Sequence, residues 1–86
     1  MEQRAKYLLE AYVPRGQIPE VAEHDGRLQA AAREMETEGR RIDYVGTLLI
    51  PEEEICFFLF EAVSAEDVAE LSRRAAIGFE RIVRAL

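Results

Sequence analysis

The sequence has few of the residue types that build reactive or nucleic-acid-binding sites. Its single cysteine, Cys56, excludes an internal disulfide and any cluster held by several thiolates. Its single lysine, Lys6, stands against 17 acidic residues and a net charge of −6, so the clustered cations of a phosphate-binding surface are missing. No apolar run approaches the roughly 20 residues of a membrane helix, and the first ten residues lack the apolar core of a signal peptide. We therefore expect a cytoplasmic protein that binds neither nucleic acid nor membrane.

The length of the chain limits its organisation to one domain, residues 1–86. A chain this short buries only about 60–65% of the surface that its unfolded form exposes, so its core is thin. Repeats and low-complexity tracts are absent from the sequence. One hydrophobic core must therefore organise every element.

Hydrophobic periodicity divides the chain into six elements. The pattern predicts strands at 6–13, 41–50, 55–62 and 79–86, and helices at 18–39 and 64–78. In the first helix, one apolar stripe recurs at spacings of three and four, formed by Val21, His24, Leu28, Ala31 and Met35.

Local signals set the expected ends of these helices. Gly39 is a natural stop for the first helix, and Gly26 lowers helix propensity in its early turns by roughly 1 kcal/mol relative to Ala. Ser64 is the expected N-cap of the second helix, with Asp67 at the capping-box position. We expect Gly78 to end that helix.

The order β-α-β-β-α-β predicts an α+β fold, the ferredoxin-like sandwich. Each β-α-β unit crosses over with right-handed geometry and the two middle strands form a hairpin. The expected result is a four-stranded antiparallel sheet with both helices on one face and the first and third strands in its centre.

The third strand, "ICFFLFEA", has no polar face. Cys56, Phe58 and Phe60 point to one side while Ile55, Phe57 and Leu59 point to the other. A carboxylate beneath a helix is costly, so we expect the face that carries Glu10 and Glu61 to be the one without helices. Leu8, Tyr12 and Phe57 would share that face.

An apolar patch of this kind usually marks an interface or a ligand site. We therefore expect a homodimer in which the helix-free faces pack together, as in a dimeric α+β barrel. The candidate ligand-binding residues of that face are Glu10, Tyr12, Phe57 and Glu61.

Two carboxylates in an apolar cleft could carry out acid–base chemistry. In the simpler interpretation, Glu10 and Glu61 lie at the rim of the sheet or pair with Arg81 or Arg84 of the last strand. The ion-paired case is expected for Glu61, and the two interpretations stay open for Glu10.

His24 is the only imidazole of the chain and so the first candidate for a metal ligand. Together with carboxylates such as Glu20 or Glu23, it would form an N/O set that suits Ni, Cu or Zn. The alternative is a half-buried helix histidine with a polar partner.

Cys56 is expected to be a buried small hydrophobe, because no activating base or cation is apparent in the sequence. The run from Glu52 to Glu54 is expected to form a solvated turn that protects an exposed hairpin from aggregation.

Two protein classes that share this topology do not fit. RNA-recognition motifs have an aromatic third strand, but their basic residue and glycines are missing here. Heavy-metal-associated domains need a cysteine pair in the loop after the first strand, and here that loop reads "VPRGQIPE".

The segment "ICFFLFEAVSAEDVAELSRRAAIGFERIVRAL" resembles a family of small bacterial ferredoxin-like proteins of unknown function, one branch of which is described as nickel-binding. The shared features are a strand like E-T-C-F-C-L-F-E-A, a helix that begins S-A-E-x-V, and a last strand like D-R-I-V-E-V. The resemblance implies a homodimer with this fold and allows a divalent metal such as nickel as a cofactor.

Three functions are compatible with these patterns. The first is a small homodimeric binding protein that holds a divalent metal or a small ligand. The second is a dimeric α+β-barrel enzyme with Glu10 or Glu61 as general base. The third is a structural dimerisation module.

Overall fold

The computed structural model describes residues 3–86 and contains the predicted elements in the predicted order. The strands are β1 (Ala5–Tyr12), β2 (Ile42–Ile50), β3 (Ile55–Ala62) and β4 (Arg81–Ala85), the helices are α1 (Val21–Thr37) and α2 (Ala65–Arg74), and the short 3-10 turns are η1 (Arg15–Glu20) and η2 (Pro51–Glu53). The α+β ferredoxin-like fold is therefore confirmed.

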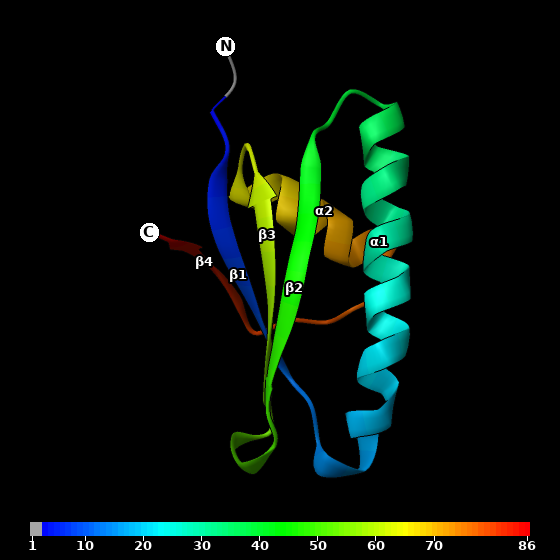
Figure 1. The fold of residues 1–86 in the computed structure, drawn as a ribbon, viewed down its shortest axis with the longest axis vertical. Helices are drawn as coiled ribbons and strands as arrows, with labels where there is room; N and C mark the ends of the chain where they lie inside the picture. Colours follow the sequence, from blue (N-terminus) through cyan, green and yellow to red (C-terminus); the bar gives the residue numbers. More distant parts are fainter. Residues whose placement is uncertain (1–2) are drawn as a thin grey trace.

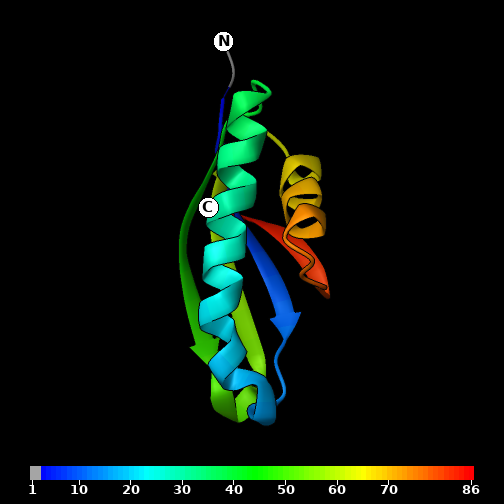
Figure 2. The ribbon, with the colours of Figure 1, turned by 90° about the vertical axis from the view of Figure 1, so that its right-hand side faces the viewer.

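The four strands form one antiparallel sheet in the order β2-β3-β1-β4, with β1 and β3 in its centre as expected. Both helices lie on the same side of this sheet (Figure 1). In the orthogonal view α1 runs along the β2 side and the shorter α2 lies beside it on the β4 side (Figure 2). The opposite face of the sheet is open.

The core lies between the sheet and the helices. Phe58 and Phe60 of β3 and Leu9 of β1 are fully buried there. Leu28 and Met35 of α1 are also fully buried, which confirms the apolar stripe predicted for this helix. Neither helix within residues 3–86 is both long enough and apolar enough to cross a membrane.

The two helices end in the same way at different residues. After α1, Gly39 has φ 82°, and the backbone N–H groups of Arg40 and Gly39 donate to the carbonyl oxygens of Met35 and Glu36. This is a Schellman motif with glycine at its left-handed position.

The predicted stop of the second helix at Gly78 is wrong, because α2 ends at Arg74. The left-handed residue is Ala76, with φ 58°. The N–H of Ile77 donates to the carbonyl of Ser72, and the N–H of Ala76 donates to that of Arg73. The Schellman motif therefore forms here without glycine, and buried Ile77 closes it against the core.

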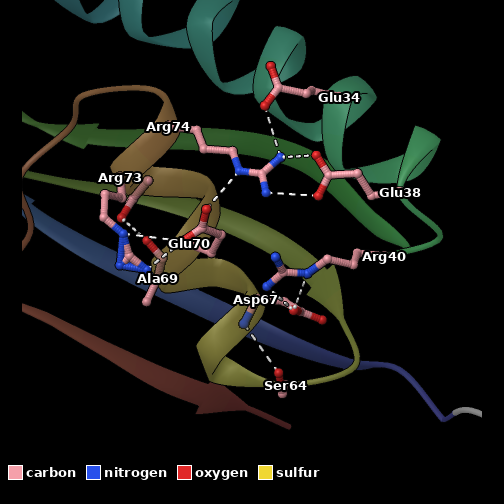
Figure 3. Close-up of polar contacts among 10 residues, drawn as sticks. Glu34, Glu38, Arg40, Ser64, Asp67, Ala69, Glu70, Arg73 and Arg74 are labelled. Atoms are coloured by element: carbon pink, nitrogen blue, oxygen red, sulfur yellow. Dashed lines mark hydrogen bonds and ion pairs between the residues drawn. The ribbon is translucent and has the colours of Figure 1, made fainter.

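Ser64 caps the start of α2 as predicted, since its hydroxyl accepts a hydrogen bond of 3.2 Å from the N–H of Asp67. The Asp67 carboxylate does not complete a capping box but accepts from Arg40, at 3.1 Å from Nε and 2.8 Å from Nη2. Both groups donate to the same oxygen, Oδ1, and this contact ties α2 to the segment that follows α1 (Figure 3).

Arg74 makes the second polar link between the helices (Figure 3). Its guanidinium lies 2.8 Å from the carboxylates of Glu38 and Glu70 and 2.9 Å from that of Glu34. Because Arg74 donates hydrogen bonds to them, the pKa values of Glu38 and Glu70 are lowered.

Candidate functional site

The open face of the sheet carries the apolar patch that the third strand predicted. Its central rows are set by strand register: Leu8 of β1 stands between Leu59 and Val83, and Phe57 of β3 stands between Glu10 and Leu48. Cys56, Phe58 and Phe60 are fully buried on the other side of β3. The face without helices is therefore the one that carries Glu10 and Glu61, as expected.

A shallow groove of about 400 Å³ crosses this face, lined by Leu8, Gly46, Thr47, Leu48, Phe57 and Leu59. Gly46 of β2 is the direct partner of Leu59. Because glycine has no side chain, the space beside Leu59 on this face is unfilled. A register shift between Tyr44 and Gly46 adds Val45 to β2 as a bulge. The bulge and the glycine together hollow the sheet at this point.

Exposure within the patch is uneven. The side chain of Leu48 is 61% exposed and that of Tyr12 is 57% exposed, whereas Phe57 is half-buried among its neighbours. Leu48 therefore projects as a ridge at one wall of the groove.

Glu10 is held by an ion pair, which was one of the two interpretations of this residue. Nε of Arg81 lies 2.9 Å from Oε1 of Glu10, and the two residues are direct partners in the β1–β4 ladder. Neither Glu10 nor Glu61 lines the groove.

The ion pair expected for Glu61 is not formed within residues 3–86. Its direct neighbours on the open face are Lys6 and Asp43. Arg84 pairs in register with Tyr7, whose ring packs against the core, so Arg84 lies on the helix side of β4 and away from both glutamates.

Glu54 departs from the expected solvated turn. Its backbone has φ 55°, and its carbonyl accepts a 2.8 Å hydrogen bond from the N–H of Val13. Its carboxylate accepts from the N–H of Arg15 at 3.0 Å and from the hydroxyl of Tyr12 at 3.4 Å. Glu54 thus fastens the β2–β3 turn to the segment after β1, while Glu52 and Glu53 are exposed.

Cys56 is the buried hydrophobe that the sequence predicted. It is fully buried in the core, and burial raises the pKa of its thiol to about 11. A thiol in this state is a poor nucleophile at neutral pH. Burial likewise raises the pKa of Tyr44, a neighbour of Phe58 and Phe60, to about 12.

His24 leans from α1 onto the core, with its ring centroid 6.1 Å from that of Phe58. Its Nδ1 is closed off from solvent and has no hydrogen-bond partner among residues 3–86, so the expected polar partner is missing. Burial, followed by the nearby charge of Arg27, lowers the pKa of its imidazole, against the opposing effect of Glu20 and Glu23.

A metal site at His24 gains no ligand set from its surroundings. Across the part of the chain that the structure describes, no three His, Cys, Asp or Glu side chains gather as metal ligands would. Glu20 and Glu23 are close enough to act on the charge of His24, but they do not form a coordination cluster with it.

A second hollow, of about 450 Å³, lies on the helix side of the molecule and includes His24. Its walls are the end of β1 (Ala11–Val13), Gln17 of η1, and the segment from Ala76 to Glu80 that leads from α2 to β4. We call it the histidine cleft. Tyr12, which the strand alternation places on the open face, also contributes to its wall at the end of β1.

Of the candidate ligand-binding residues, Glu10, Tyr12, Phe57 and Glu61 share the open face, but only Phe57 lines the groove. Sequence reasoning missed Gly46 and Leu48, which shape it. One signal was present, because a glycine in the interior of a strand often marks a bulge or a close approach. The histidine cleft had no such signal, since its walls come from segments far apart in the sequence.

Comparisons of this chain with protein-family models, with curated proteins and with solved structures find no significant match. The resemblance of residues 55–86 to the small ferredoxin-like family therefore stays a prediction.

Proposed function

We propose that the protein is a homodimeric binding protein in which the open sheet faces of two copies pack together and enclose a small apolar molecule. The observation that carries this proposal is the groove on the open face, whose lining is almost entirely hydrocarbon and contains no charged residue. Small-molecule sites are usually concave and mostly apolar, with volumes of about 300–1,000 Å³. The groove falls within that range.

The distribution of polar groups supports sheet-to-sheet packing. The apolar rows occupy the middle of the face, while the Glu10–Arg81 pair lies toward its β4 edge and Lys6, Asp43 and Glu61 lie across one end. An apolar centre with a charged rim is the usual anatomy of a protein interface.

The size of the face fits a small interface. β1, β2 and β3 have 8 or 9 residues and β4 has 5. At about 3.3 Å per residue and a strand spacing of about 4.8 Å, the four strands present roughly 480 Å² in projection. Side chains that stand out from the sheet increase the accessible area, toward the roughly 800 Å² per partner of a standard interface. We therefore expect a dimer at the small end of that class.

The enzyme alternative has less support. A general base in the groove should line it, and neither glutamate does. Glu10 also forms an ion pair with Arg81, so its carboxylate is already engaged by another side chain. A divalent metal at His24, such as nickel, also has less support, because no cluster of metal ligands forms among the described residues.

Sedimentation analysis of Leu48→Glu tests the dimer. Leu48 is 61% exposed in the single chain, so a charge there leaves the folded monomer nearly unaffected but would be buried in the interface. We expect wild type at about 20 kDa, twice the 9.8 kDa of the chain, and the variant near the monomer mass with an unchanged circular dichroism spectrum. Phe57→Glu should have a stronger effect, because Phe57 also packs within the sheet.

The control Ala30→Glu adds the same charge to an exposed position of α1 and should stay dimeric. A monomeric wild type, or a Leu48→Glu variant that dimerises as well as wild type, would show that the open face is not the interface.

Titration with indole, followed by amide NMR spectra, tests the ligand site. Indole is small, neutral and mostly apolar, and it should shift the amides around Leu8, Leu48 and Leu59. Gly46→Leu should abolish these shifts, because a Cβ at Gly46 meets no atom within 4 Å and the added side chain is free to fill the groove.

Gly26→Leu is the matched control, since Gly26 is exposed on α1 and its Cβ would also meet open space. Equal indole shifts in both variants would refute the groove as the site, and so would the absence of shifts in the wild type.

A further inference from the structure

The histidine cleft exists because α2 is short. α2 has 10 residues and α1 has 17, which correspond to lengths of about 15 and 26 Å. From Ala75 to Glu80 the chain leaves α2 and returns to the sheet, where the N–H of Glu80 donates to the carbonyl of Glu10 at 2.7 Å. Beyond the end of α2, the helix side of the sheet is covered by this loop instead of a helix, and a hollow of about 450 Å³ stays open beside α1.

The side chains at this hollow differ from those of the groove on the open face. His24, Gln17 and Glu80 contribute polar groups, and Phe79 contributes an aromatic ring that is 41% exposed. Glu80 forms no ion pair within residues 3–86. The cleft therefore combines a carboxylate without a salt-bridge partner, an imidazole, an amide and a ring in one place.

His24 forms part of the wall of the cleft, and one of its ring nitrogens, Nδ1, lacks a hydrogen-bond partner among the described residues. Nδ1 of His24 is buried, and buried polar groups in folded proteins are nearly always paired. Because its surroundings favour the neutral imidazole, one of its ring nitrogens is a hydrogen-bond acceptor.

The charge around the cleft selects the sign of the ligand. Among the described residues that line it, Glu80 is the one that carries a full charge, and that charge is negative. The whole chain carries −6. A cation is attracted to such a site and an anion is repelled, and an exposed ring such as that of Phe79 adds a favourable face for an ammonium group.

We propose that the histidine cleft binds a small organic amine in its protonated form. The Glu80 carboxylate accepts hydrogen bonds from the ammonium group, Gln17 and His24 supply further polar contacts, and Phe79 covers the organic part. The residues that line this cleft are different from those that line the apolar groove, so the two sites can be tested separately.

Benzylamine, which is protonated at neutral pH, is the probe that tests this proposal, with benzoate and benzyl alcohol as probes of matched shape. Amide NMR titrations to about 20 mM suit a ligand with so few atoms. We expect benzylamine to shift the amides of Gln17, His24 and Gly78–Glu80, and to change the ring ¹⁵N shifts of His24. Benzoate should leave these signals unchanged, and benzyl alcohol should bind more weakly than benzylamine.

Glu80→Gln should lower the affinity for benzylamine about tenfold or more, because it removes a charged hydrogen-bond acceptor. Glu80 is exposed, so the variant should fold normally. The control Glu53→Gln removes the same charge from the exposed η2 turn and should bind as wild type does.

The proposal is wrong if benzoate binds as well as benzylamine, if Glu80→Gln and Glu53→Gln behave alike, or if no probe shifts the cleft residues. Shifts confined to Leu8, Leu48 and Leu59 would assign the amine to the groove and would also overturn it.

Discussion

Replacing Ala76 by glycine should stabilise the protein. Ala76 holds φ 58° at the end of α2, and the left-handed conformation costs an L-residue about 1–2 kcal/mol. Glycine avoids this cost, but it gives the unfolded chain extra freedom that offsets about 0.4–1 kcal/mol. The net gain in the free energy of unfolding is therefore about 0.5–1 kcal/mol. For a domain of this size, that gain corresponds to about 2–8 °C in Tm.

Thermal and urea unfolding at one fixed protein concentration measure this gain, because the Tm of an oligomer depends on concentration. Two further variants serve as controls for Ala76→Gly. Gly39→Ala places alanine at the equivalent position of α1, where the added Cβ meets nothing within 4 Å, so its loss of stability reports backbone strain alone. Ala69→Gly puts glycine in the interior of α2 and should cost about 1 kcal/mol.

Ala76→Gly must therefore raise stability while Ala69→Gly lowers it. If both substitutions lower it by similar amounts, Ala76 is not strained and the left-handed ending of α2 has no energetic consequence. If Gly39→Ala is neutral, the same reasoning fails for α1.

Three further predictions concern ionisable side chains. Arg74→Gln should reduce the amount by which the free energy of unfolding falls in acid. Arg74 lowers the pKa of carboxylates such as Glu38, so their stabilising effect is present above the ordinary value of 4.5 and is lost as pH falls below it. Urea unfolding at a series of pH values between about 3 and 6 measures this loss. Because burial raises the pKa of the Cys56 thiol to about 11, the free energy of unfolding should fall as pH rises from 9 toward 11. The thiol of the native protein should also react with a disulfide reagent about a hundredfold or more slowly than that of the protein unfolded in urea. Fast labelling of the native protein would contradict its burial. Glu54→Ala should lower the free energy of unfolding by about 1 kcal/mol through lost hydrogen bonds, whereas equal effects of Glu54→Ala and Glu53→Ala on urea unfolding would mean that these bonds contribute nothing.

The strands and helices could be predicted because their signals are local. The alternation of β3 placed Phe58 in the core and Phe57 on the open face, and the spacing from Val21 to Met35 located the buried stripe of α1. The end of α2 could not be predicted in the same way. Gly78 was the obvious stop, but the Schellman hydrogen bonds of this helix close around Ala76.

The candidate sites depend on contacts between distant segments, and these were harder to foresee. The sequence showed that Glu10 could meet Arg81, because β1 and β4 were expected to be neighbours. It did not show that Glu54 would bind the segment after β1, since this depends on how a turn folds back on the sheet. The histidine cleft likewise depends on the length of α2 and the path of the loop after it.

The central position of β1 has a consequence for how the chain folds during synthesis. β1 pairs on one side with β3 and on the other with β4, so Lys6 must meet both Glu61 and Ala85. β1 therefore leaves the ribosome well before β4, and its pairing is incomplete until β4 has emerged. Contacts so distant in sequence slow folding. Until then Leu8 and Leu9 are exposed on an unpaired strand, a form that is prone to aggregate. Nascent chains arrested before Arg81 should consequently be captured by chaperones far more than chains arrested after β4 has emerged.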